Sequence, residues 1–223
     1  WNALTTFVHR QARMADMVSN GLPQAIADVI PEYGFHFERD GQAKIAETDR
    51  FILRDIEESD VEGIFDLDSD PDVLAYIGTP PIKTLDEAYE IIKYIRNQYA
   101  ENGIGRWAVV DKKTSDFVGW SGLKYEQVVR SEFDYYDIGY RLRKKYWGQG
   151  IASLTASESL RYGFEQLSLN EICGAADINH QVSNHILQKI GLRYVEQFVF
   201  EGETANFYRI TKSQWLSKND LGH

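Results

Sequence analysis

Cysteine is almost absent from this chain of 223 residues, because Cys173 is the single one. One cysteine cannot form an internal disulfide, and its place in the apolar run 171–178 predicts a buried, inert thiol rather than a nucleophile. The histidines show no metal-ligand spacing with this cysteine or with one another; they are His9, His36, His180, His185 and His223. We therefore expect neither a disulfide framework nor a metal site.

Positive charge and long apolar runs are also scarce. Lysine and arginine number 24 against 34 aspartates and glutamates, which gives a formal net charge of −10. This balance argues against nucleic acid as a partner; it favours cationic partners such as amines, or it serves solubility alone. No apolar run has membrane-spanning length and no signal peptide is visible, so we expect a cytoplasmic protein without a membrane partner.

Two common nucleotide-binding motifs are missing as well. A Walker loop is excluded because Gly-x-x-x-x-Gly-Lys-Ser/Thr does not occur. A Rossmann site needs the pattern Gly-x-Gly-x-x-Gly, and Ser153 stands where its third glycine would be. The Rossmann motif also follows the opening strand of its βαβ unit, whereas the two glycines here lie two-thirds along the chain.

What the chain does contain is Gly148-Gln149-Gly150, placed between a strand-like run at 133–142 and an amphipathic helical run from Ile151. Strand, Gly-x-Gly turn and helix direct several backbone N–H groups and a helix dipole at one anion. Glycine also lets a phosphate approach the backbone without meeting a Cβ. We interpret the stretch as a pyrophosphate site, against the alternative of an ordinary turn.

Hydrophobic periodicity predicts the elements around this turn. Strands are expected at 50–56, 106–110, 117–125, 133–142, 171–178, 195–200 and 206–210. Capping boxes at Ser59-Asp60-Val61-Glu62 and at Thr84-Leu85-Asp86-Glu87 each predict a helix start. The expected buried stripes of three helices are Leu85, Ala88, Ile91, Ile92, Ile95 and Tyr99; Ile151, Leu154, Leu160, Phe164 and Leu167; and Val182, Ile186, Leu187 and Ile190. This order indicates an α/β layer fold with a partly parallel centre.

Residues 1–46 do not share this pattern. Leu4, Phe7 and Val8 begin a helical spacing, and 35–39, which precede Asp40-Gly41, could form one arm of a hairpin. We expect an N-terminal appendage at 1–46, a main domain at 47–218 and a tail at 219–223. The appendage is either a packing or dimerisation arm, which would make a homodimer, or a tag-like remnant.

Four ordered stretches resemble the GNAT N-acetyltransferase superfamily, in particular its RimJ/RimL-type branch, which includes acetylases of ribosomal-protein N-termini. They are Thr48–Arg54; Asp137-Ile138-Gly139-Tyr140; Lys145-Tyr146-Trp147-Gly148-Gln149-Gly150, which matches the signature Gln/Arg-x-x-Gly-x-Gly/Ala with a basic Lys first; and Ser183 with Leu187–Leu192. The resemblance extends from about Thr48 to about Trp215. It implies a GNAT fold: a central mixed, mostly antiparallel sheet, flanked by helices, whose two parallel strands splay apart and hold acetyl-CoA between them.

The resemblance also implies which residues bind acetyl-CoA. Backbone groups near 138–142 would hold the pantetheine arm and donate to the acetyl oxygen, and N–H groups of 145–152 would bind the pyrophosphate. Arg143, Lys144 and Lys145 would add positive charge, unless they are only a solvated basic turn. The full expected set is Ile138, Gly139, Tyr140, Arg141, Leu142, Arg143, Lys145, Tyr146, Trp147, Gly148, Gln149, Gly150, Ile151, Ala152, Asn179 and Ser183.

Acetyl transfer to an amine needs a base for the ammonium and an acid for the thiolate. Asp137 stands where relatives of the branch often carry Glu, and Glu201 or Glu203 near the last hairpin are alternative bases. The family's usual acid, a Tyr, is replaced by Leu187. Ser183 aligns with a serine that can serve instead, or it merely caps its helix.

One further position departs from the family pattern. His180 occupies the place of the family's Asn, and Asn179 lies one residue away.

The segment 70–83 has two interpretations. It either shapes the acceptor pocket, as the corresponding segment does in the family, or is a plain connecting loop.

We therefore expect direct transfer of an acetyl group from acetyl-CoA to a primary amine. Direct transfer is preferred because Cys173 lies in an expected core strand. A protein N-terminal amine is the first acceptor class, and polyamines or aminoglycosides are next. The alternative from a different class is a catalytically weak acyl-CoA-binding sensor or interaction protein, which the missing Tyr and the displaced Asn keep open.

Overall fold

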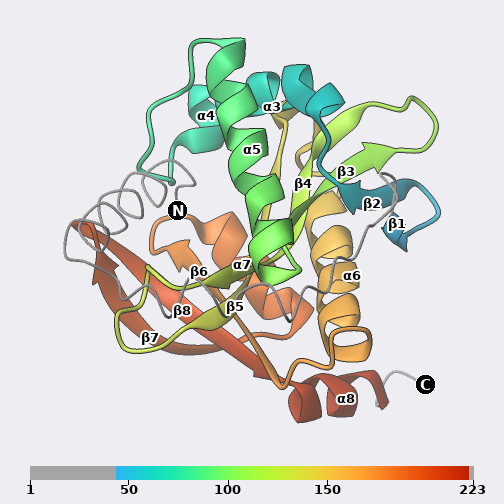
Figure 1. Cartoon of the computed structure of the whole chain (residues 1–223). Helices are drawn as coiled ribbons and strands as arrows, with labels where there is room; N and C mark the ends of the chain where they lie inside the picture. The colour runs from blue at the N-terminus through green and yellow to red at the C-terminus, as the bar shows by residue number, and fades with distance from the viewer. Residues whose placement is uncertain (1–43, 221–223) are drawn as a thin grey trace, which may run out of the picture.

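A computed structural model describes residues 44–220 of the chain, and its framework is one mixed sheet (Figure 1). In spatial order the strands are β1 (Lys44–Glu47), β2 (Phe51–Asp55), β3 (Arg106–Asp111), β4 (Phe117–Glu126), β5 (Tyr135–Leu142), β6 (Glu171–Asp177), β8 (Glu203–Thr211) and β7 (Arg193–Phe200). Every neighbouring pair is antiparallel except β5 and β6, which are parallel. The expected mixed, mostly antiparallel α/β fold is confirmed.

The parallel pair holds together at a single point. β5 is in register with β6 only at Asp137 and Cys173. By contrast, the whole of β5 is paired with β4, from Tyr135 opposite Glu126 to Leu142 opposite Gly119. β6 is likewise paired with β8 along its length. The sheet therefore consists of two firmly paired halves that meet at one residue pair and separate toward the carboxyl ends of β5 and β6.

Helices cover both faces of the sheet (Figure 1). The two faces form separate cores, which is why Trp107 and Val109 on β3 belong to one core and Ala108, between them, to the other. On one side lie the short η2 (Glu58–Asp60), α3 (Val61–Asp68), α4 (Pro71–Leu74) and α5 (Leu85–Asn102); on the other lie α6 (Ile151–Glu165), α7 (Gln181–Ile190) and α8 (Lys212–Asp220). A short turn, η3 (Lys144–Tyr146), precedes α6.

One of the two capping boxes is confirmed. The Oγ1 of Thr84 accepts from the N–H of Glu87 at 3.3 Å, and the Glu87 carboxylate accepts from the N–H of Thr84 at 2.9 Å. The prediction for Ser59 is wrong, since the reciprocal pair there is Glu57 with Asp60. Both oxygens of Asp60 also bind the guanidinium of Arg54, six residues earlier on β2, at 2.7 and 2.8 Å.

The expected buried stripes are confirmed apart from three residues. Leu85, Leu154 and Val182 are 45%, 42% and 66% exposed, whereas later members such as Ile92, Leu160 and Leu187 are buried. All three exceptions lie in the first turn of their helices. A helical period predicts which face is apolar, but it does not tell which of its members are covered, since Ile151 at the start of α6 is buried while Leu154 is exposed.

The described sheet begins at Lys44, ahead of the expected domain start at residue 47, and α8 continues to Asp220, past the expected end at 218. The helix expected from Leu4 and the hairpin expected at 35–39 lie outside the described residues. Of the helices between residues 44 and 220, none is long and apolar enough to cross a membrane.

Candidate active site

The glycine turn has the geometry that an anion site at a helix start requires. Gly148 and Gly150 have φ angles of +72° and +73°, in the left-handed region that favours glycine. A Cβ added at either position would meet no atom within 4 Å, so the space beside the turn is open. The first helical bond runs from Leu154 N–H to the Gly150 carbonyl, which leaves the N–H groups of 151–153 without partners inside α6. The turn fits a phosphate group.

The basic residues of the turn are not isolated cations. Arg143 lies against Asp66, Lys144 against Asp72, and Lys145 against Asp116, with 3.3 Å between the last two charged groups. Both lysines are more than half exposed. The positive charge expected beside the turn is therefore shared with three carboxylates from other parts of the chain.

A cation that the sequence reasoning missed also reaches the turn. The guanidinium of Arg50, at the start of β2, donates to the side-chain oxygen of Gln149 at 3.2 Å and forms an ion pair with Asp111 at 2.8 Å. No local pattern relates Arg50 to a turn about one hundred residues later in the chain, so only the fold reveals this contact.

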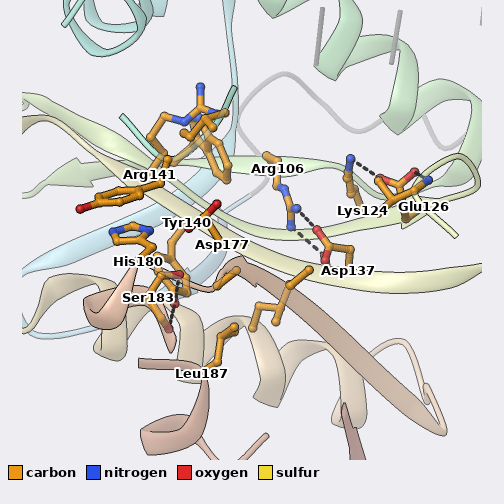
Figure 2. A pocket seen from close by; sticks show the side chains of 18 of the residues that line it. Arg106, Lys124, Glu126, Asp137, Tyr140, Arg141, Asp177, His180, Ser183 and Leu187 are labelled. Carbon is orange, nitrogen blue, oxygen red and sulfur yellow. Dashed lines mark hydrogen bonds and ion pairs between the residues drawn. The ribbon is translucent and has the colours of Figure 1, made fainter. Parts of the chain in front are cut away.

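A cavity of about 110 Å³ opens where β5 and β6 separate (Figure 2). Its walls come from β3, β4, β5, β6, α7 and the segment that follows α4. The polar and aromatic lining residues include Tyr76, Arg106, Trp120, Lys124, Glu126, Asp137, Tyr140, Arg141, Asp177, His180 and Ser183. Since Tyr76 and Ile77 belong to the lining, the segment 70–83 does contribute to the pocket wall.

Asp137 lies in this wall and is held by Arg106. The guanidinium donates to Oδ2 of the carboxylate and, at 2.7 Å, to the Asp137 carbonyl oxygen. Both side chains are largely buried, with 15% of Asp137 and 9% of Arg106 exposed. Burial raises the pKa of Asp137 above its ordinary value, although the charges of Arg106 and Lys124 oppose the rise. A carboxylate with a raised pKa is suited to accept a proton.

A second buried ion pair lies beside the first. The Nζ of Lys124 is 2.5 Å from Oε2 of Glu126, and Oε1 of Glu126 accepts from the N–H groups of Val128 and Val129 at 2.8 and 3.2 Å. Burial would raise the pKa of Glu126, but Lys124 and the two N–H groups outweigh it and hold this pKa below its ordinary value. Neither Lys124 nor Glu126 was expected at the site, because a charged residue in a predicted strand is normally interpreted as facing solvent.

The lining also includes two hydroxyl groups in contact. The hydroxyl of Tyr140 lies 3.1 Å from Oγ of Ser183 and donates to the Ser183 carbonyl at 3.0 Å, which links β5 to α7 across the cavity (Figure 2). Burial raises the pKa of Tyr140, so its proton is retained at neutral pH. The capping alternative for Ser183 is wrong, because His180 is the N-cap residue and Ser183 lies inside the helix.

Comparison with known proteins decides the family. Residues 50–193 match the family model described as an acetyltransferase (GNAT) domain. The chain belongs to the GNAT acetyltransferase family. It is 29% identical over 174 residues to the uncharacterized N-acetyltransferase YoaA of Bacillus subtilis, covering 75% of this chain and 97% of the relative. It is 32% identical over 165 residues to the FsC-acetyl coenzyme A-N(2)-transacetylase of Aspergillus fumigatus, covering 67% of this chain and 68% of the relative.

A solved GNAT structure supports the fold independently. Spermidine N-acetyltransferase from Vibrio cholerae, determined in complex with CoA and spermine, superposes with a TM-score of 0.61 at 20% identity, covering 76% of this chain and 99% of that one. This likeness confirms the GNAT fold, and the family match makes the chain an N-acetyltransferase. The separated parallel strands implied by the sequence resemblance are present.

Not every residue expected at the GNAT site is brought to the cavity. Asn179 is exposed and does not line it, whereas His180 does, with its ring stacked on Tyr76 at 4.5 Å between ring centres. Burial lowers the pKa of His180 and so favours its neutral form. Glu201 and Glu203 flank the exposed turn at Gly202 and are likewise outside the lining.

Cys173 is confirmed as a buried thiol. It is 1% exposed, and burial raises its pKa far above that of a free cysteine. The thiolate, which is the nucleophilic form, is therefore strongly disfavoured at neutral pH. The chemistry of this GNAT site has to come from oxygen and nitrogen groups.

Proposed function

We propose that the chain transfers the acetyl group of acetyl-CoA directly to a primary amine, inside the cavity between β5 and β6. The observation that carries the proposal is the single register pair of Asp137 with Cys173. Past this point the strands separate, the cavity opens, and the anion-binding turn follows β5 by only a few residues. The same strand, β5, thus contributes to the cavity wall and leads into the turn that we propose as the phosphate site.

The residues present fit coenzyme A. The turn at 148–150 and the first N–H groups of α6 would hold the pyrophosphate. β5 is paired with β4 along its full length, but with β6 only at Asp137, so backbone groups of 138–142 on the β6 side would face the pantetheine arm. The bound acetyl-CoA would supply an activated thioester carbonyl.

Within the cavity, we assign Asp137 as the base that removes the proton of the acceptor ammonium. It lies in the wall, and its raised pKa favours proton uptake. We assign the hydroxyl pair of Tyr140 and Ser183, which also lines the cavity, as the source of the proton for the departing thiolate. Cys173 takes no part, which supports direct transfer over an acetylated enzyme.

For the acceptor we favour the N-terminal amine of a protein or peptide, which rests on the RimJ/RimL-type resemblance. The cavity lining carries three carboxylates, Glu126, Asp137 and Asp177, beside its cations. Arg106 and Lys124 are each paired with one of these carboxylates, so the wall suits an acceptor that brings an ammonium group. Polyamines, which the Vibrio cholerae protein binds as spermine, are the second candidate.

Thermal unfolding with and without acetyl-CoA tests the first part of the proposal. A ligand at 100 times its dissociation constant adds about 2.7 kcal/mol to the free energy of unfolding, which is easily measured. Mass spectrometry of products then compares a peptide with a free N-terminus, the same peptide with a blocked N-terminus, and spermidine. Acetylation of the free peptide alone supports the proposal. Stabilisation by acetyl-CoA without any acetylated amine would favour an acyl-CoA sensor instead.

A further inference from the structure

Arg106 lies across the sheet in an unusual setting. Arg106 on β3 is in register with Gly122 on β4, and Gly122 is in register with Gly139 on β5. Side chains at directly opposed positions point to the same face of a sheet, so the arginine extends over two positions that carry no side chain. Its guanidinium donates to the carbonyl oxygens of Gly122 and Asp137 and to the Asp137 carboxylate.

Gly139 lies so close to the guanidinium of Arg106 that a side chain at this position would collide with it. A Cβ built there would lie 2.7 Å from Nη2 and 2.9 Å from Cζ of Arg106, closer than real contacts allow. Gly139 does not have a positive φ angle, so its backbone conformation does not demand glycine. Gly139 therefore leaves room for the guanidinium that passes over β5.

We infer that Arg106 is a positioning residue for acetyl transfer: it fixes the Asp137 carboxylate in the cavity wall, and Gly139 makes this contact sterically accessible. The inference rests on the proposed function, in which Asp137 is the base. Two of the three acceptors of Arg106 are backbone carbonyls on β4 and β5, so the guanidinium is fixed to the strands themselves. The carboxylate oxygen Oδ2 is thereby held relative to the backbone that lines the cavity.

Stability alone is a weak reason for this arrangement. A buried ion pair gives little net stabilisation, because the desolvation of both charges offsets most of their attraction. A rigid carboxylate at a reacting centre has a larger effect, since small displacements of a catalytic group lower rates strongly. The groups that act electrostatically on Asp137 or respond to it come from β3, β4, β5 and β6; they are Arg106, Lys124, Glu126, Tyr135, Tyr140 and Cys173.

A double-mutant cycle in the full chain tests the inference. Arg106→Gln, Asp137→Asn and the double variant are compared for kcat, KM and the pH profile of kcat/KM with the best amine. Arg54→Gln is the matched control, since Arg54 forms a similar two-point ion pair with Asp60 away from the cavity. We expect Arg106→Gln to lower kcat by about 10- to 100-fold in the wild-type background and to cause no further loss in Asp137→Asn.

The pH profile separates positioning from a merely structural role. Because the Arg106 charge opposes protonation of Asp137, its removal raises the carboxyl pKa, and the acid limb of kcat/KM should move to higher pH. Arg54→Gln should leave that limb in place. Equal losses of kcat in both backgrounds, or an unmoved acid limb, would overturn the inference.

Two further results keep the test decisive. If Arg106→Gln does not fold, Arg106→Lys replaces it, because one ammonium keeps the charge but cannot reach all three acceptors. For this variant the kcat criterion of the cycle decides, and the acid limb should stay near its wild-type position because the charge remains. Absence of acetyl-CoA binding or of turnover in the wild type would remove the proposed function and the inference together. Wild-type turnover with an Arg106→Gln variant of unchanged kcat would remove the inference alone.

Discussion

The two ends of the proposed site are built differently. The proposed phosphate end is ten consecutive residues, 143–152, and its groups are backbone N–H donors exposed by two glycines. The acceptor end is a cavity to which four strands, one helix and the segment after α4 each contribute side chains. Binding a generic anion needs only a backbone shape, whereas recognising and deprotonating one particular amine needs side chains that only the fold can gather.

The electrostatics of the two ends differ as well. Around the turn, the pairs Lys144–Asp72 and Lys145–Asp116 are half exposed, so water screens them and a phosphate could replace the carboxylates at little cost. In the cavity, Lys124 and Glu126 are almost fully buried, and neither can lose its partner without leaving an unpaired charge. The charges of the proposed phosphate end are exposed, and those of the proposed acceptor end are buried and paired.

The largest expected effect separates chemistry from cofactor binding. Asp137→Asn should lower kcat by about 100-fold or more, the range usual for a lost general base, while stabilisation by acetyl-CoA is retained. Steady-state kinetics and thermal unfolding measure the two quantities. Asp60→Asn, which loses a carboxylate paired with Arg54 outside the cavity, is the control and should keep its kcat. Retained turnover in Asp137→Asn would exclude this residue as the base.

The reverse pattern is expected at the phosphate end. Gly148→Glu should raise the KM for acetyl-CoA by about tenfold or more, because it adds a side chain and a negative charge where phosphate would bind. Gly103→Glu is a matched control, since Gly103 also has a positive φ angle of +68° and open space around it, but lies at the end of α5. Equal effects of the two variants would show that strain, not the lost site, is responsible.

The free energy of unfolding should change most when the buried pair of Lys124 and Glu126 is broken. Glu126→Gln leaves Lys124 buried without a counter-charge and should lower the free energy of unfolding by about 3 kcal/mol or more. The folded pKa of Glu126 is lowered, so its stabilisation is present above the unfolded pKa and is lost as pH falls through the folded one. The variant should therefore lose less stability on acidification than the wild type. Glu90→Gln, at an exposed pair with Lys93, is the control, and it should measurably change neither the free energy of unfolding nor its loss on acidification.

The smallest expected effect is at Cys173. Cys173→Ala should leave kcat and KM nearly unchanged, because the buried thiol cannot become a thiolate at neutral pH. Intact-protein mass spectrometry after incubation with acetyl-CoA should show no acetylated enzyme. An acetyl adduct that disappears in the variant would contradict direct transfer.

The sequence predicted the parts of the fold that depend on neighbours along the chain. The strand and helix order, the Thr84 capping box and the glycine turn all arise from local periodicity and local backbone preference. The failures concern the surroundings of single side chains. Asp60 forms its capping pair with Glu57 and also binds Arg54, and Leu85, Leu154 and Val182 are exposed although they fit the apolar period.

The site divides along the same line. The amino-acid sequence by itself determined the glycine turn before α6 and the position of Asp137 on the preceding strand, because glycine spacing and strand patterning are properties of consecutive residues. The tertiary structure alone decided that Arg106, Lys124 and Glu126 surround that carboxylate, that His180 rather than Asn179 lines the cavity, and that Glu203 does not. Electrostatic partners act through space, so charges that are unremarkable in their own strands become a reactive centre only when the sheet aligns them.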